Sequence, residues 1–278
     1  MKPFPVPVVG AGSQPDDEPL QVLAAPGAME TFRMPAPRSA ASPQALERAR
    51  GLLSRLLAQM QANPFVAADM PALDLAREPA EVVEQVNELL GQGEVSCRVA
   101  GPRHLRIQES GFAAIWRVQE WREDGTLTGD RVETGAIPRA LREVLDAPDG
   151  ASSAAPEPGP GVMNAPALLH EILQASTAAQ GARVINLTLL PVTPQDLDYL
   201  AAALGAGPVT LLSRGYGNCR IASTAVPRVW WVQYFNAMDQ LILNTVEVVD
   251  IPEVALAARE DYEDSRERLA EWIATLES

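Results

Sequence analysis

Cysteine and histidine are scarce in this 278-residue chain, and the common spacings of catalytic and metal-binding residues are missing. Cys97 and Cys219 are the only cysteines, which excludes a framework of several disulfides and any Cys-x-x-Cys pair. The two histidines, His104 and His170, lie far apart, and no Gly-x-Ser-x-Gly nucleophile motif occurs. The sequence therefore predicts no metal site, no cofactor and no catalytic residue, and we expect a protein that is not an enzyme.

The chain also lacks a long apolar run and a net positive charge. No stretch of about 20 apolar residues could cross a bilayer, and prolines interrupt the N-terminus where a signal peptide would need a continuous apolar stretch. The formal net charge of −14 disfavours binding to nucleic acid and to anionic lipid. We therefore expect an acidic, cytoplasmic protein without membrane insertion and without a nucleic-acid partner.

Two low-complexity segments divide the rest of the chain. Residues 1–42 and 146–162 are rich in Pro, Gly and small or acidic residues and lack hydrophobic periodicity, so we expect an extended or disordered arm and a linker. Residues 43–145 and 163–278 are the predicted folded parts, and each opens on an amphipathic helix. The first of these helices is predicted to begin at Ser42-Pro43, a capping residue followed by proline in the first turn.

The two folded parts are copies of one unit. Residues 73–138 align without a gap with residues 187–252, with 17 identities in 66 positions where unrelated sequences would share roughly 4 or 5. Each copy is predicted to contain a Leu-x-Leu strand (73–75 or 187–189), a helix, and three or four further strands. The predicted fold class is α+β, a tandem duplication of a small helix plus a mostly antiparallel sheet.

Charged residues that are identical in the two copies need a physical explanation. Arg106 and Glu133 of the first copy correspond to Arg220 and Glu247 of the second. Because a partly buried charge needs a partner, we interpret Arg106–Glu133 and Arg220–Glu247 as structural ion pairs between neighbouring strands. A peptide-binding clamp or an acid–base site is the alternative.

Two alternatives stay open around the tryptophan-rich strand of the second copy. Trp230 is predicted to be a core residue, so Trp231 faces the other way and either forms an exposed recognition surface or lies under a helix. Cys219 is either a buried strand cysteine or a reactive thiol whose pKa is lowered by the neighbouring Arg220. Its counterpart in the first copy is the apolar Leu105, which favours the buried alternative.

The second copy also carries the motifs of a resemblance. The stretch 211–269, with GYGNCRI and ILNTVEVVDIP as its most specific parts, is similar to the conserved C-terminal region of the HupH/HyaF (HoxQ) hydrogenase expression and formation proteins. The segment GAGSQPDDEPLQVLAAPGAMETFRMP is similar to that family's opening segment, so the resemblance covers essentially the whole chain. The first copy has GPRHLRI in place of GYGNCRI, and any role of this motif would belong to the second copy.

The resemblance implies a cytoplasmic accessory protein in the maturation of a nickel–iron uptake hydrogenase. It implies binding to the iron–sulfur small subunit precursor before export, alongside a thioredoxin-like maturation protein. A Cys219-dependent role in delivery or repair of an iron–sulfur cluster is the alternative. Binding is expected along a strand edge or in a groove between the copies. The motif positions carried over, without an assigned role, are Gly215, Tyr216, Gly217, Asn218, Cys219, Arg220, Asn236, Asn244 and Thr245.

Overall fold

The computed structural model describes residues 42–63, 65, 71–101, 103–146, 155–178, 181–214 and 218–275. The strands are β1 (Ala72–Asp74), β2 (Val95–Val99), β3 (His104–Glu109), β4 (Ile115–Trp121), β5 (Leu127–Thr134), β6 (Arg183–Asn186), β7 (Ala206–Ser213), β8 (Asn218–Thr224), β9 (Val229–Phe235) and β10 (Leu241–Val248). The helices are α1 (Pro43–Ala62), α2 (Ala80–Leu90), α3 (Arg139–Leu145), α4 (Ala165–Thr177), α5 (Pro194–Leu204) and α6 (Arg259–Thr275), with a short 3-10 turn, η1, at Glu253–Ala255.

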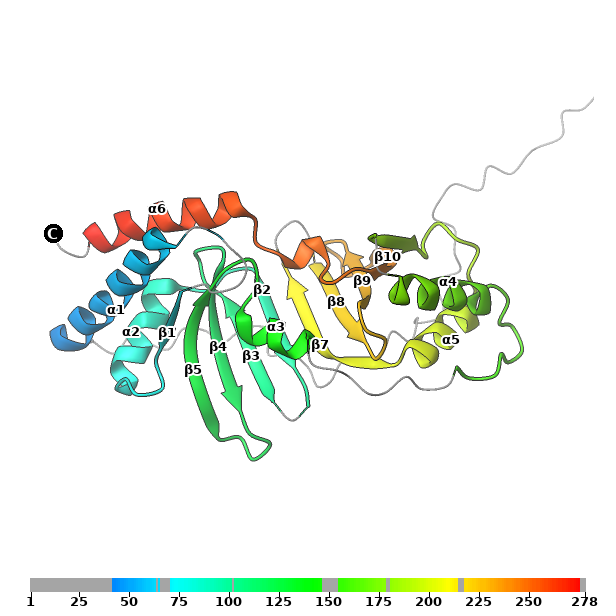
Figure 1. The fold of residues 1–278 in the computed structure, drawn as a ribbon, viewed down its shortest axis with the longest axis horizontal. Coiled ribbons are helices and arrows are strands. Elements are labelled where there is room, and N and C mark those ends of the chain that lie inside the picture. Colours follow the sequence, from blue (N-terminus) through cyan, green and yellow to red (C-terminus); the bar gives the residue numbers. More distant parts are fainter. Residues whose placement is uncertain are drawn as a thin grey trace, which may run out of the picture. The chain divides into compact units, whose positions relative to one another are not determined.

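Within these residues the two repeats form one ten-stranded sheet (Figure 1). Its order is β1-β5-β4-β3-β2-β7-β8-β9-β10-β6, and neighbouring strands are antiparallel. Each strand of the first repeat thus occupies the place that mirrors its counterpart in the second. The predicted α+β duplication is confirmed. The division into an arm (1–42), a first repeat (43–145), a linker (146–162) and a second repeat (163–278) stays a prediction, and the two repeats share a sheet.

The central β2–β7 pair carries a pseudo-twofold axis. Cys97 lies opposite Leu211 in this pair, and the two residues are repeat counterparts, because the gapless alignment shifts the numbering by 114 residues. The pair Val95–Ser213 maps in the same way onto Val209–Val99. The axis therefore passes through the Cys97–Leu211 pair and relates one repeat to the other.

Side chains alternate along each strand, so the register assigns them to two faces of the sheet. One face carries an apolar cluster that spans both repeats and is covered by α3 and η1; we call it the α3 face. Trp116 and Trp230 lie in this cluster, which confirms the prediction made for Trp230, and each is 2 % exposed. Trp116 Nε1 donates to the Gly135 carbonyl at 2.9 Å, and Trp230 Nε1 donates to the counterpart carbonyl of Val249 at 3.2 Å.

The opposite face is covered by helices at its two ends. α1, α2 and α6 pack over the first repeat, and α4 and α5 pack over the second. Trp231 is buried among the residues that contact α4 and α5, so the alternative in which a helix covers it is confirmed. Between these ends, β3, β2, β7 and β8 present Arg98, Arg106 and Arg220, and we call this central region the arginine face.

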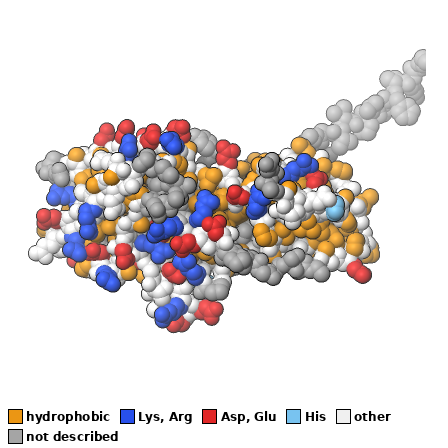
Figure 2. All heavy atoms as spheres, viewed as in Figure 1, with side chains coloured by type: hydrophobic (Ala, Val, Ile, Leu, Met, Phe, Trp, Pro, Cys, Tyr) orange, Lys and Arg blue, Asp and Glu red, His pale blue; other side chains and the backbone are white. Residues whose placement is uncertain are grey.

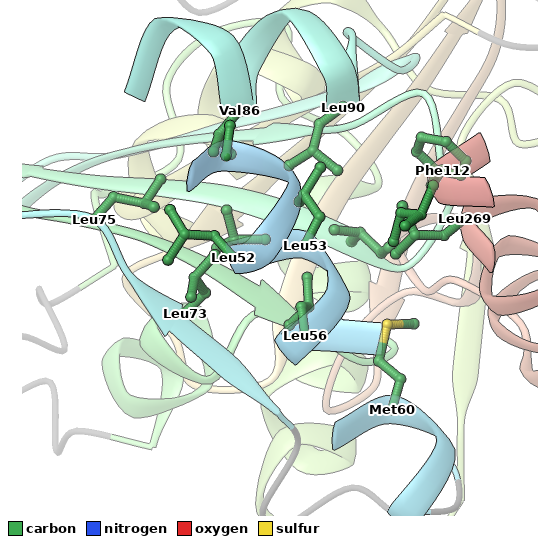
Figure 3. Packing of buried hydrophobic residues seen from close by; sticks show 14 of the residues in the cluster. Leu52, Leu53, Leu56, Met60, Leu73, Leu75, Val86, Leu90, Phe112 and Leu269 are labelled. Carbon is green, nitrogen blue, oxygen red and sulfur yellow. The ribbon is translucent and has the colours of Figure 1, made fainter. Parts of the chain in front are cut away.

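The C-terminal helix of the second repeat packs on the first. Leu269 is fully buried and lies with the α1 residues Leu53 and Met60 and with Phe112 in one cluster (Figure 3). The spacing of Leu269, Trp272, Ile273 and Leu276 predicts one buried stripe on this helix. Leu269 and Ile273 are buried, the prediction is wrong for Trp272, which is 42 % exposed, and Leu276 lies outside the described residues. The first repeat therefore has a covering helix that comes from the other end of the chain.

The Leu-x-Leu strand predicted at 187–189 is wrong by two residues. Leu75 N–H donates to the Asp130 carbonyl at 2.8 Å, and Leu187 N–H donates to the counterpart carbonyl of Asn244 at 2.9 Å. Leu187 therefore corresponds to Leu75, and Leu189 is 80 % exposed. Because α2 and α5 keep the 114-residue spacing, two extra residues lie between β6 and α5.

Candidate functional site

Among the described motif residues of the second repeat, Cys219 and Arg220 lie on opposite faces of the sheet, and Asn218 and Asn236 lie at its turns. Gly215, Tyr216 and Gly217 lie outside the described residues. Asn218 follows them at the start of β8, and its Nδ2 donates to Asp239 Oδ1 at 3.0 Å. Asp239 belongs to the turn between β9 and β10, and Asn218 pairs with Phe235 at the end of β9.

Asn236 holds that turn together. Its Oδ1 accepts hydrogen bonds from the backbone N–H groups of Met238 at 2.9 Å and Gln240 at 3.0 Å. The structure thus brings Asn218 and Asn236 to the same end of the two hairpins, where they fix the turn geometry. These hydrogen bonds give Asn218 and Asn236 a structural role in the turns.

Asn244 and Thr245 are buried within the sheet and face opposite ways. Asn244 Oδ1 accepts from Trp231 Nε1 at 2.5 Å, which satisfies an indole N–H that would otherwise be buried without a partner. Thr245 Oγ1 donates to the Val232 carbonyl at 3.3 Å. Both residues therefore have structural contacts, and their role in binding stays a prediction.

The predicted ion pairs Arg106–Glu133 and Arg220–Glu247 are wrong. Arg106 lies opposite Gln119, which lies opposite Asp130, so Glu133, three residues further on, points to the α3 face. Glu133 instead accepts from Arg131 Nε at 2.5 Å and from the backbone of α3.

The same register separates the pair in the second repeat. Arg220 faces Gln233 and Asn244, whereas Glu247 faces the α3 side beside Trp230. The equal separation of the arginine and the glutamate in the two repeats therefore does not indicate a contact between them.

Cys219 lies on the α3 face and is buried, while its neighbour Arg220 lies on the arginine face. Burial raises the pKa of the Cys219 thiol to about 11, against the opposing effect of a hydrogen bond with Tyr234. Glu247 adds a charge that raises the thiol pKa further. The interpretation that Arg220 lowers this pKa is therefore wrong, and the buried alternative is the correct one.

Cys219 is accordingly expected to react slowly in the folded protein. A thiol with a pKa of about 11 has a roughly 100-fold lower thiolate fraction at neutral pH than one with an ordinary pKa near 9. Alkylation by iodoacetamide, followed by mass spectrometry with and without guanidinium chloride, measures this difference. The Arg220→Gln variant is the control, and its rate should equal that of the parent. Rapid alkylation of Cys219 in the folded state contradicts the assignment.

The arginine face has an unusual arrangement of charge. Arg98 and Arg106 are exposed and lie directly opposite each other on β2 and β3. The guanidinium carbon of Arg106 lies 4.9 Å from the ring centroid of Trp121. Nearer the edge, Arg117 forms an ion pair with the buried Asp130.

A second surface is apolar and lies in the second repeat. Met163, Leu189 and Leu190 are 71 %, 80 % and 39 % exposed, and we call this group the apolar corner. The segments that carry them are tied together, because Asn164 Nδ2 donates to the Pro191 carbonyl at 2.6 Å. Figure 2 shows hydrophobic side chains gathered over α4 and α5, whereas basic and acidic side chains alternate over the first repeat.

The described residues contain neither a cluster suited to a metal ion nor a membrane-spanning helix. No group of three or more His, Cys, Asp or Glu side chains comes together among them. None of their helices combines the length and the apolar character needed to cross a bilayer.

A family model describes both repeats. The model of the HupH hydrogenase expression protein, C-terminal conserved region, matches residues 47–155 and again residues 162–276. The chain belongs to the HupH hydrogenase expression protein family. The two matches fall on the two repeats. Each repeat therefore corresponds to one copy of this family region.

Several relatives of this family are similar over nearly their whole length. The hydrogenase expression/formation protein HoxQ of Cupriavidus necator is 43 % identical over 99 % of this chain and 100 % of its own. HupH of Rhodobacter capsulatus is 44 % identical over 96 % and 95 %. The hydrogenase-1 operon protein HyaF of Escherichia coli K12 is 32 % identical over 96 % of each. The solved hydrogenase expression protein HupH from Thiobacillus denitrificans shares 35 % identity over 40 % of this chain and 96 % of its own, with a TM-score of 0.38.

Proposed function

We propose that this protein is a non-catalytic accessory protein in the maturation of a nickel–iron uptake hydrogenase. It binds the iron–sulfur small subunit precursor in the cytoplasm before export, alongside a thioredoxin-like maturation protein. The names of its relatives, hydrogenase expression and formation proteins, support the general role. The apolar corner is the observation that supports binding of a protein client.

The apolar corner lies beside an edge of the sheet. β6 is the last strand in the order and pairs with β10, and Leu189 N–H donates to the carbonyl of Asn186, the last residue of β6, at 3.3 Å. An edge strand offers backbone N–H and C=O groups to an added strand, and neighbouring apolar side chains can hold that strand in place. Exposed Met and Leu side chains next to such an edge are typical of a protein-binding surface.

The alternative that depends on Cys219 has less support. Its thiol is buried on the α3 face, and its pKa is raised rather than lowered. A thiol that passes a cluster or a metal to a client needs to be accessible and readily deprotonated. Neither condition holds for Cys219.

The proposal is tested by co-purification with a tagged small subunit precursor. The double variant Met163→Ser/Leu189→Ser is expected to weaken the complex at least roughly tenfold, because both side chains are exposed and would be buried by a client. The matched control, Met238→Ser/Leu46→Ser, removes an exposed Met and an exposed Leu elsewhere and should bind like the parent. A parent protein that does not bind the precursor at all rejects the function. Equal binding by both double variants rejects the apolar corner as its site.

A further inference from the structure

We propose that the arginine face is a docking surface for an acidic segment of a partner polypeptide. The segment would carry several Asp or Glu side chains in an extended conformation. This inference goes beyond the proposed function, because it does not depend on the partner being a hydrogenase subunit.

The charge of the arginine face is opposite to that of the whole chain. The chain has 36 acidic and 22 basic residues, a formal net charge of −14. Yet the side chains that the paired stretches of β2, β3, β7 and β8 present here include no Asp or Glu in the described residues. They include Arg98, Arg106 and Arg220, separated by small or neutral side chains such as Ser96 and Thr210. A local positive surface on an acidic protein attracts a carboxylate-bearing segment.

The fold itself does not require this arrangement. Arg98 stands directly opposite Arg106, and two like charges in that position destabilise a sheet. The pseudo-twofold axis places Leu212 at the position of Arg98 and Arg220 at that of Arg106, and they too lie opposite each other. The backbone therefore accepts leucine at this position, so the stability of the sheet does not explain the presence of Arg98.

The arginine side chains are also suited to carboxylates. Arg106 stacks over the Trp121 ring at 4.9 Å, which orients its guanidinium group and lowers the entropy lost on binding. Guanidinium groups bind carboxylates through two parallel hydrogen bonds, and Arg98 and Arg106 are exposed enough to do so.

A long polyanion is a poorer occupant than an acidic peptide. The formal net charge of −14 repels the phosphates of a long nucleic acid, most of which would extend past the arginine face. A short peptide that lies between the two helical ends of the sheet meets the arginine residues and the uncharged side chains between them. Charge complementarity and size therefore favour a protein segment.

The inference is tested with a fluorescent peptide in which Glu and Val alternate, measured by anisotropy at low salt. Arg98→Leu is the main variant, because it copies the residue at the counterpart position. It should weaken binding roughly tenfold while the protein stays at least as stable, since a like-charge contact is removed. Arg106→Gln should weaken binding similarly. The matched control, Arg77→Gln, removes an exposed arginine outside this face and should leave the affinity unchanged.

Three results would overturn the inference. Equal losses in Arg98→Leu and Arg77→Gln would mean that net charge alone attracts the peptide. A peptide with Gln in place of Glu that binds equally well would exclude carboxylate recognition. A gain of roughly tenfold on replacing Asp16, Asp17 and Glu18 by Asn, Asn and Gln in the full chain would make the chain's own N-terminal run the occupant. No effect of that replacement, together with the expected losses, supports a separate partner.

Discussion

Replacement of Leu269 by alanine is expected to lower the free energy of unfolding by about 3 kcal/mol. Leu269 is fully buried and carries α6 onto α1 and Phe112 in the core of the first repeat. Loss of its side chain removes apolar burial and leaves a cavity that α1 and α6 can close only in part. Urea unfolding followed by circular dichroism measures the change.

Trp272→Ala on the same helix is the matched control for Leu269→Ala. Trp272 is larger but 42 % exposed, so its loss should cost less than that of Leu269 despite the greater volume removed. An equal or larger loss in Trp272→Ala would contradict the packing of α6 described above.

Replacement of Asp196 by asparagine is expected to lower the free energy of unfolding by about 2 kcal/mol at neutral pH. Asp196 is buried at the start of α5, where it forms a capping box with Thr193. Its carboxylate also ties α4 to α5. It accepts the backbone N–H groups of Met163 at 2.7 Å, Asn164 at 2.9 Å, Ala165 at 2.9 Å and Thr193 at 3.0 Å.

The pH dependence of this stabilisation follows from the pKa of Asp196. Burial opposes the charged form, but the four N–H donors outweigh it and lower the pKa to about 2. Since the folded pKa lies below the ordinary value of 3.8, the stabilisation is complete above about pH 4 and is lost as pH falls towards 2.

The difference in stability between parent and Asp196→Asn, measured by urea unfolding, should therefore shrink across that acidic range. Asp198→Asn, on the same helix but exposed, is the control and should stay within about 0.5 kcal/mol of the parent. A difference that persists unchanged below pH 2 would contradict the role assigned to the Asp196 charge.

Local signals in the sequence were sufficient for much of the fold. Ser42 caps α1 through a hydrogen bond from the Ala45 N–H at 3.2 Å, as the Ser-Pro pair predicts. The Asp124-Gly125 turn between β4 and β5 forms with Gly125 at a φ of 82°, where glycine is favoured. These features depend on neighbouring residues, so the sequence determines them directly.

Contacts that depend on strand register could not be read in the same way. Two leucines align by chance at 189 and 75, and the backbone hydrogen bonds and burial of the folded chain show that Leu187 takes the place of Leu75. Whether Arg106 meets Glu133 depends on two successive registers, and an offset of one residue moves a side chain to the other face. Sequence identity between the repeats shows which residues are retained, but it does not show on which face of the sheet each side chain lies.

The importance of Asp196 could have been found from the sequence. Thr193 and Asp196 have the Thr-x-x-Asp spacing of a reciprocal helix cap, directly before an apolar helix. Its second set of contacts, to the start of α4, joins positions 31 to 33 residues apart and needed the structure. The arginine face likewise combines strands of both repeats.

The axis through Cys97 and Leu211 has an evolutionary consequence. An ancestor with a single repeat that kept this edge pairing would have been a symmetric homodimer, with one residue facing its own copy at the centre. Fusion of two copies of such a gene would have freed each half from that self-complementarity. The first half could then pack against a C-terminal helix, and the second could acquire a glycine-rich motif. At the axis, where a homodimer would pair two identical residues, the fused chain has Cys97 opposite Leu211.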